Sequence, residues 1–251
     1  MLTGKGLWLW QLSACGDEDD PWPLMSRLLP LGLSHLVVKV TDGAKPYNDT
    51  ATLQRLVRAC HMEHIAVWGF GYTYGASEEH AALEGNELGA RCKGLELDGA
   101  VIDAESEYET ANSSAWAQSY CQAVKSAFAG PLALSSFWKP SVHAAFPWDA
   151  FCASVDVLMP QVYWGDRDAA FTLRESAAEF APYLKVYPHL QFFPTGAIDQ
   201  EEGGGNPLKV THFCAEVDAE GWAGANMWDL QEEVPSMLAA FAAWKPGSGS
   251  V

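Results

Sequence analysis

Short apolar segments alternate with helix-like segments along the whole chain, and this alternation limits the possible folds more than any other feature. Eight segments have the length and the β-branched or aromatic content of buried strands, and a segment with helical spacing of apolar residues follows each of them. The strand-like segments are residues 6–12, 35–41, 65–72, 97–105, 131–137, 155–164, 185–193 and 224–228. This pattern predicts an α/β fold, a (β/α)8 TIM barrel that forms a single domain.

The predicted helices carry recognisable start signals. Asn48-Asp49 can cap the second helix, and Ser77 precedes a helix whose first turn holds Glu78 and Glu79. Pro207 suits the first turn of another helix. The remaining helices are expected at residues 22–33, 113–129, 146–153, 168–182 and 233–244. A doubly wound open sheet is the alternative arrangement, but the chain has no glycine-rich phosphate loop after its first strand.

The chain shows no shift in composition that would mark a domain boundary. Residues 1–245 are therefore expected to form one domain, and residues 246–251, rich in Gly and Ser, a flexible tail. The net charge is −17, from 15 basic and 32 acidic residues, which argues against nucleic acids and anionic membranes as partners. No apolar run approaches the roughly 18 residues that a membrane span needs. As an isolated domain the protein is expected to be a monomer.

Metals and cofactors are not expected either. The six cysteines are scattered and form no C-x-x-C pair, so we expect reduced thiols and neither a zinc site nor a disulfide framework. His61 and His64 have helical i, i+3 spacing without a recognisable third ligand, which indicates a solvated helix face. The acidic loop at residues 16–20 lacks the regular ligand alternation of a calcium loop, so we interpret it as solvated charge.

The fourth strand-like segment, residues 97–105, carries the strongest chemical signal. It begins with the turn dipeptide Asp98-Gly99 and ends with Asp103 and Glu105, two residues apart. A strand places such residues on the same face, so the two carboxyl groups should project together. Two like charges on one face raise the pKa of at least one of them, which suits general acid catalysis. The alternative is an acid pair that only reaches solvent at a strand end.

The other predicted strands end in aromatic and amide side chains. In a barrel of this kind the chemistry lies at the carboxyl ends of the strands. Besides Asp103 and Glu105, the candidate site residues at these ends are Trp10, Tyr72, Gln161, Tyr163, Trp164, Trp228 and Asp229. Aromatics, amides and carboxylates suit a neutral polyhydroxylated ligand such as a sugar polymer. Asp229 has an alternative structural role as a cap for the last helix.

The segment Asp98-Gly99-x-x-Ile102-Asp103-x-Glu105 resembles the fourth-strand signature of (β/α)8 glycoside hydrolases. It is similar to the D-G-x-D-x-D-x-E motif of family 18 chitinases and to the shorter D-x-E of family 25 lysozymes. Residues 36–43 and 69–72 are similar to strands of family 25, and residues 159–164 to a strand end of family 18. Val101 stands at the middle Asp of the family 18 motif, and Trp10-Gln11 where family 25 carries a first-strand Asp.

The resemblance implies roles for individual residues. Glu105 would protonate the leaving oxygen, Asp103 would orient the N-acetyl group of the substrate, and Tyr163 would hydrogen-bond that group. The remaining candidates would bind the substrate, namely Gln161, Trp228, Tyr72, Trp164, Asp229 and Trp10. A conventional retaining scheme needs a carboxylate on the seventh strand, and residues 185–193 contain none. Only Asp199, Glu201 and Glu202 follow it, in a loop that is expected to be flexible.

The implied activity is cleavage of a β-1,4-linked N-acetylhexosamine polymer. Peptidoglycan, cleaved as by a muramidase, is the first candidate substrate and chitin the second. The first ten residues show no signal peptide, so synthesis in the cytoplasm and a role as a phage endolysin or virion-associated lysin are expected. A non-catalytic carbohydrate-binding barrel and a barrel whose acids serve only stability are the alternatives.

Overall fold

The computed structural model describes residues 1–16 and 19–247. The predicted tail at residues 246–251 and the acidic loop at residues 16–20 therefore lie partly outside the described residues.

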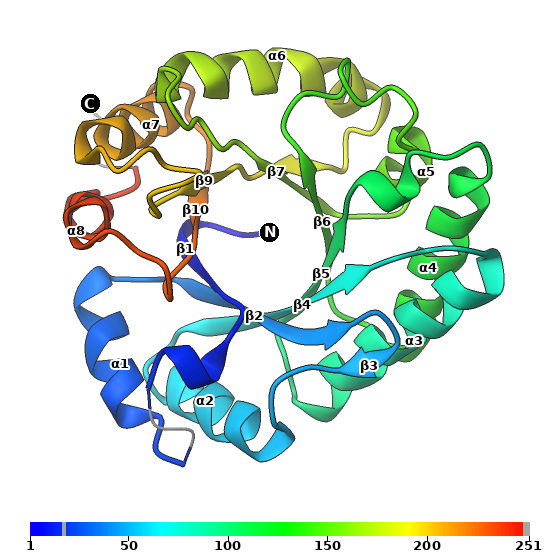
Figure 1. Cartoon of the computed structure of the whole chain (residues 1–251), viewed down its shortest axis with the longest axis horizontal. Coiled ribbons are helices and arrows are strands. Elements are labelled where there is room, and N and C mark those ends of the chain that lie inside the picture. The colour runs from blue at the N-terminus through cyan, green and yellow to red at the C-terminus, as the bar shows by residue number, and fades with distance from the viewer. Residues whose placement is uncertain (17–18, 248–251) are drawn as a thin grey trace.

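The strands form a closed barrel, seen end-on in Figure 1. The strands are β1 (Gly4–Leu9), β2 (His35–Asp42), β3 (Lys45–Pro46), β4 (Ala66–Thr73), β5 (Gly99–Ala104), β6 (Leu132–Phe137), β7 (Val157–Gln161), β8 (Gln191–Phe192), β9 (Thr195–Ala197) and β10 (Gly224–Trp228). β1 pairs in parallel with both β10 and β2, which closes the ring. In the described residues β8 and β9 share one position and β3 is an antiparallel arm on β2, which leaves eight parallel positions. The predicted single-domain (β/α)8 TIM barrel is confirmed.

An outer ring of helices covers the barrel (Figure 1). The helices are α1 (Trp22–Leu28), α2 (Thr50–Met62), α3 (Glu78–Gly94), α4 (Ser113–Ala127), α5 (Trp148–Cys152), α6 (Ala169–Val186), α7 (Pro207–Ala219) and α8 (Pro235–Ala243). Two predicted caps are confirmed: the side chain of Asp49 accepts a hydrogen bond from Thr52 N, and that of Ser77 accepts one from His80 N.

The seventh barrel position differs from the prediction at both ends. The sequence predicted the start of a strand at residue 185, but α6 continues through Pro182 to Val186. The helix accommodates Pro182 because this residue lies on its exposed face. Pro194 has no N–H for the sheet and separates β8 from β9. The strand position therefore ends at Ala197, and the loop that contains Asp199 and Glu202 follows it directly.

The first strand ends at Leu9, three residues earlier than predicted. The strand ends here because the side chain of Asn48 makes the backbone hydrogen bonds that a neighbouring strand would make if β1 were longer. Its amide nitrogen donates to the carbonyl oxygen of Trp10, and its oxygen accepts from Leu12 N. The chain then turns into a short 3-10 helix at Leu12–Ala14.

Two layers of apolar side chains lie on the two faces of the sheet. Strand β5 shows the alternation that was predicted: Val101 belongs to the cluster inside the barrel, whereas Ile102 and Ala104 belong to the layer beneath the helices. Leu2 also belongs to the interior cluster, and its backbone exchanges two hydrogen bonds with the side chain of Gln191.

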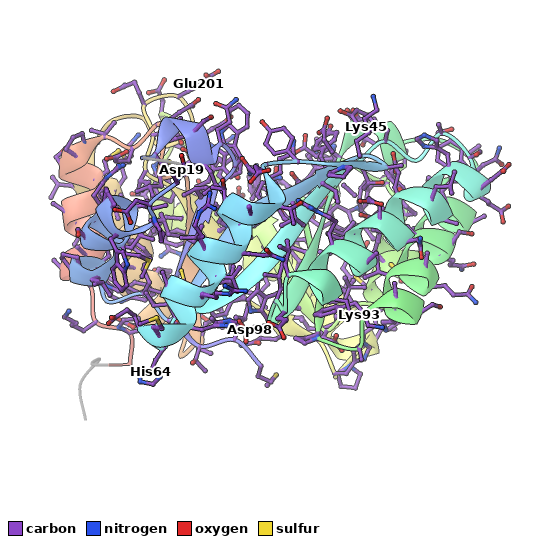
Figure 2. All side chains as sticks on the ribbon, turned by 90° about the horizontal axis from the view of Figure 1, so that it is seen from below. Asp19, Lys45, His64, Lys93, Asp98 and Glu201 are labelled. Atoms are coloured by element: carbon purple, nitrogen blue, oxygen red, sulfur yellow. The ribbon has the colours of Figure 1, made fainter. Side chains whose placement is uncertain are left out.

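The two ends of the barrel are separated in Figure 2. Lys45 and Glu201, which follow strands, lie along the upper edge, and His64, Lys93 and Asp98, which precede strands, lie along the lower edge. The strand ends that carry the candidate site residues thus open at the upper edge.

Three further findings concern membrane spans, metal sites and thiols in the described residues. Within residues 1–16 and 19–247, no helix is long and apolar enough to cross a membrane, and no group of three or more His, Cys, Asp and Glu side chains is placed to hold a metal ion. All six cysteines are buried free thiols.

A buried histidine makes stability depend on pH. His35 Nε2 lies 2.7 Å from the Asn226 amide oxygen, and burial lowers the pKa of His35 from 6.5 to about 4. Between pH 6.5 and 4 the His35 imidazole binds a proton more readily in the unfolded chain than in the folded one. Its burial therefore leaves the free energy of unfolding unchanged above pH 6.5 and lowers it increasingly as the pH falls towards 4. We expect the free energy of unfolding to fall by about 2 kcal/mol through His35 between pH 7.5 and 5.

Urea unfolding at the two pH values measures this effect. His35→Gln should be less stable at pH 7.5 but should lose less stability on acidification than the wild type. His212→Gln, which changes an exposed histidine of α7, should keep the wild-type pH dependence. Equal pH dependence in wild type and His35→Gln would contradict the assignment.

Candidate active site

A cavity of about 250 Å³ lies at the carboxyl end of the barrel strands. Its lining consists of carboxyl, amide, hydroxyl and aromatic side chains from six positions around the ring. The lining residues are Trp8, Asp103, Glu105, Ser135, Gln161, Tyr163, Glu202 and Trp228. The structure thus brings together the three predicted catalytic residues, Asp103, Glu105 and Tyr163, with two predicted binding residues, Gln161 and Trp228.

Gln161 joins the two predicted catalytic carboxyl groups. Its amide nitrogen donates to Asp103 Oδ1 over 3.2 Å and to Glu105 Oε1 over 3.0 Å. Asp103 is 7% exposed, and this burial together with the charge of Glu105 raises the pKa of Asp103 well above its usual range. The Lys39 ammonium acts in the opposite direction but also forms an ion pair with Asp42. The raised pKa of Asp103 thus favours its protonated form more than in an ordinary carboxyl group, which is the direction that general acid chemistry requires.

Tyr163 and the tryptophans form the rest of the wall. Burial and the charges of Asp103 and Glu105 raise the pKa of Tyr163, so its phenol stays protonated and can donate a hydrogen bond to a ligand. The rings of Trp8 and Trp228 lie 5.8 Å apart. Among the described residues, the indole nitrogen of Trp8 is buried and has no hydrogen-bond partner.

Tyr72 lies close to the acid pair but is not among the lining residues of the cavity. Its hydroxyl donates to Glu107 Oε1 over 2.9 Å, and burial raises the pKa of the phenol. The charges of Asp103 and Glu105 raise it further. Glu107 was missed in the sequence, although the spacing of Asp103, Glu105 and Glu107 continues a strand-like alternation of acids.

Trp164 and Asp229 require a correction to the sequence prediction. Trp164 is fully buried against Phe213 in the layer beneath the helices, and its indole nitrogen donates to the carbonyl oxygen of Gly203. Asp229 is also fully buried, and its carboxylate accepts hydrogen bonds from Glu232 N and from Gln231 Nε2. Neither side chain reaches the cavity, and Asp229 caps the turn before α8 and not the helix itself.

Trp10 is displaced by the early end of β1. It packs at the edge of the interior cluster as a partly buried side chain and does not line the cavity. Trp8, two residues earlier and within β1, takes the place that was predicted for Trp10. A correct strand end would have identified it, because both residues share the alternation.

Glu202 enters the cavity from the loop after β9. Burial and the neighbouring charge of Asp199 raise its pKa. The sequence offered Glu202 only as a residue of a flexible loop, because the seventh strand was placed too early. Ser135, within β6, was not predicted; its hydroxyl oxygen accepts a third, longer hydrogen bond from Gln161, over 3.4 Å.

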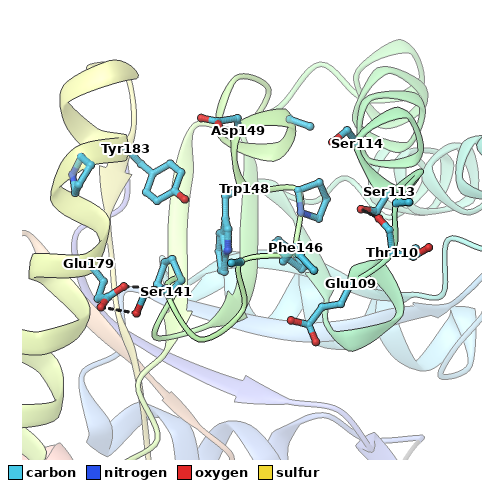
Figure 3. Close-up of a pocket in the computed structure, with 17 residues that line it drawn as sticks. Glu109, Thr110, Ser113, Ser114, Ser141, Phe146, Trp148, Asp149, Glu179 and Tyr183 are labelled. Carbon is cyan, nitrogen blue, oxygen red and sulfur yellow. Dashed lines mark hydrogen bonds between the residues drawn. The ribbon is translucent and has the colours of Figure 1, made fainter.

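A second, larger cavity of about 700 Å³ lies outside the barrel between α4, α5 and α6 (Figure 3). Its carboxylates already have partners. Both oxygens of Glu179 accept hydrogen bonds from Ser141, drawn as dashed lines in Figure 3, and Asp149 accepts one from Tyr187. The smaller cavity, with the acid pair and an unpartnered indole, is therefore the candidate active site.

Comparisons with known proteins match the architecture. No family model and no curated protein match the sequence. A chitinase from Bacteroides thetaiotaomicron superposes with a TM-score of 0.73 at 11% identity, over 99% of this chain and 98% of that chain. A family 113 β-1,4-mannanase gives a TM-score of 0.68 at 11% identity, over 96% of this chain and 97% of that chain.

An endo-β-N-acetylglucosaminidase from Cordyceps militaris gives a TM-score of 0.65 at 13% identity, over 97% of this chain and 91% of that chain. This structure holds fucosyl-N-acetylglucosamine-Asn and carries Asn and Gln in place of an Asp and a Glu two positions apart. At these identities the likenesses establish the fold, and barrels of one architecture host many chemistries.

Proposed function

We propose that this protein is a glycoside hydrolase that cleaves β-1,4-linked N-acetylhexosamine polymers, with Glu105 as the general acid. The observation that carries the proposal is the pair of hydrogen bonds from Gln161 to Asp103 and Glu105 within one cavity. The names of the similar chitinase and endo-β-N-acetylglucosaminidase support it, as does the Asp and Glu spacing of the latter, which equals that of Asp103 and Glu105.

In the proposed reaction the substrate supplies its own nucleophile. The carbonyl oxygen of the N-acetyl group attacks the anomeric carbon, the bond from that carbon to the leaving oxygen breaks, and Glu105 donates its proton to that oxygen. Asp103 accepts a hydrogen bond from the acetamido N–H and stabilises the positive charge of the cyclised sugar. Water then opens the ring and returns its proton to Glu105. Tyr163 donates to the acetamido oxygen, and Trp228 lies against the sugar face.

Peptidoglycan, cleaved as by a muramidase or phage lysin acting on the cell wall, is the first polymer that we propose, and chitin is the second. The resemblance of the second and third strands to family 25 lysozymes supports the former. The net charge of −17 disfavours binding to an anionic wall, and the chitinases among the similar structures support the latter. Both polymers therefore belong in the test.

Glu202 favours a second candidate reaction. A carboxylate that lines the cavity from the loop after β9 could attack the anomeric carbon itself, as in a conventional retaining glycosidase. This scheme would not need an N-acetyl group, and the similar β-1,4-mannanase is named for a substrate without one.

The test incubates the purified protein with peptidoglycan and with N-acetylglucosamine oligosaccharides and identifies products by mass spectrometry. New reducing ends from either polymer are expected. Saccharide binding by calorimetry without any product, even after long incubation, would instead indicate a non-catalytic carbohydrate-binding barrel. Absence of both binding and products would leave the acids a purely structural role.

A further inference from the structure

Two cations converge on one tryptophan at the rim of the barrel. The guanidinium carbon of Arg167 lies 4.8 Å from the centre of the Trp138 ring, and the Lys139 ammonium lies 5.4 Å from it. Trp138 and Lys139 directly follow β6, whereas Arg167 lies in the loop after β7, the neighbouring strand. The cluster therefore lies at the carboxyl end of the barrel strands, as the candidate active site does.

Arg167 is held in place without a carboxylate. Its Nη2 donates to the carbonyl oxygen of Tyr163 over 3.0 Å, and its guanidinium lies over the Trp138 ring. Within the described residues, Arg167 Nε and Nη1 have no acceptor, and no carboxylate forms an ion pair with this side chain. A guanidinium that is held in this way and still has free N–H groups is suited to bind a planar anion such as a carboxylate.

A third cation lies in the same part of the rim. Lys209, in the first turn of α7, donates from its ammonium to the carbonyl oxygen of Gly165, two residues before Arg167. Of the three cations, only Lys139 has a carboxylate partner in the part of the chain that the structure describes, namely Glu175 at 3.4 Å.

The acidic residues on either side of Arg167 in the sequence do not pair with it. Asp168 caps α6, where its carboxylate accepts a hydrogen bond from Phe171 N over 2.7 Å. Asp166 is exposed, and among the described residues neither acid forms an ion pair with Arg167. This part of the rim thus presents unpaired positive charge on a protein whose net charge is −17. Such local charge attracts an anionic group of a ligand.

Arg167 lies beside the cavity but not in its wall. Tyr163, whose carbonyl oxygen holds Arg167, lines the cavity. The charge of Arg167 also acts to lower the pKa of Glu202, another lining residue, against the effect of burial. Arg167 itself is exposed and is not a lining residue. A ligand group that meets it must therefore belong to a saccharide that extends from the cavity over the rim towards Trp138.

From this geometry we infer that Arg167, held over Trp138, binds a carboxylate of the saccharide, so that the substrate is an acidic N-acetylhexosamine polymer, the glycan strand of peptidoglycan. The inference rests on the proposed function, because it chooses between the two polymers named there, and chitin carries no carboxylate. In peptidoglycan the carboxylate belongs either to the lactyl ether of muramic acid or to a peptide attached to it. Arg167 is thus a specificity residue outside the catalytic cavity.

Calorimetric binding at pH 7 and low salt tests the inference without requiring turnover. The neutral probe is the tetrasaccharide of N-acetylglucosamine. The second probe is the tetrasaccharide of alternating N-acetylglucosamine and N-acetylmuramic acid with free lactyl carboxylates. The third probe carries an alanyl-glutamate peptide on each lactyl group, so its carboxylates belong to the peptide alone. Preference for the second or for the third probe identifies which carboxylate is bound.

The wild type is expected to bind one carboxylated probe about fivefold more tightly than the neutral probe, the value of one charge-assisted contact at an exposed site. Arg167→Gln should lose this preference, because Gln cannot supply the positive charge. Arg174→Gln is the matched control and should keep it. Arg174 is an exposed arginine of α6 whose guanidinium pairs with Glu216, and its replacement changes the net charge equally.

Each result decides the inference. Equal affinity for the three probes, preference for the neutral probe, a preference that survives Arg167→Gln, or no binding of any probe would overturn it. Hydrolysis of N-acetylglucosamine oligosaccharides and of peptidoglycan is assayed separately. Hydrolysis without the carboxylate preference would overturn this inference alone, and the carboxylate preference without hydrolysis of either polymer would overturn the proposed function alone.

Discussion

Glu105→Gln is expected to lower kcat on N-acetylglucosamine oligosaccharides by about a thousandfold, within the range that general acid catalysis contributes. Gln cannot donate a proton to the leaving oxygen. Its side-chain oxygen can still accept the hydrogen bond from Gln161, so the cavity and the KM should change little. Initial rates of product formation, with circular dichroism to compare the folds, measure the effect.

A substrate with an activated phenol leaving group makes the test specific for the acid. Such a leaving group departs without a proton, so Glu105→Gln should lose much less activity on it than on the oligosaccharide. Glu109→Gln is the matched control, because Glu109 lies on the same connection but pairs with His143 outside the cavity. Full activity of Glu105→Gln, or an equal loss on both substrates, would contradict the role of Glu105.

The barrel was predictable because each βα unit carries its own signal. Short apolar strand segments, helical spacing and caps such as Asp49 and Ser77 are local features, and they agree with one another around the whole ring. The acid pair followed from the same reasoning. Asp103 and Glu105 project together because the chain keeps a period of two residues from β5 to the residue that directly follows it.

The errors arose where non-local contacts decide a strand end. Asn48, which lies in a distant loop, hydrogen-bonds the chain after β1 and so ends this strand. For this reason the sequence prediction named Trp10 where the structure has Trp8. Pro194 splits the seventh position and moves its end towards Glu202. Sequence spacing cannot report either event.

Trp164 shows a different limit. It follows β7 in sequence, as a site residue would, but its indole turns outward to meet Gly203 O and Phe213. Only the packed structure distinguishes the inner face of a barrel from the outer face once a strand has ended, because the alternation of side chains then no longer applies.

Asp103→Asn is expected to lower kcat on N-acetylglucosamine oligosaccharides by about a hundredfold, as for the loss of one group that stabilises transition-state charge. Asn cannot offset the positive charge of the cyclised sugar, although it can keep the hydrogen bond from Gln161. The measurement is kcat for Asp103→Asn and for Glu202→Gln, side by side. If the substrate is its own nucleophile, Glu202→Gln should lose less than tenfold on these neutral oligosaccharides.

The two candidate reactions predict opposite orders for these variants. A nucleophilic Glu202 would make Glu202→Gln the more severe change and would allow hydrolysis of polymers without N-acetyl groups. Inhibition by a thiazoline analogue of the cyclised sugar separates the schemes independently, because only an enzyme that stabilises the cyclised sugar binds the analogue tightly. Asp103 and Glu202 line the same cavity, and each variant removes one carboxyl group from it. A difference between the variants therefore reports where the nucleophile comes from.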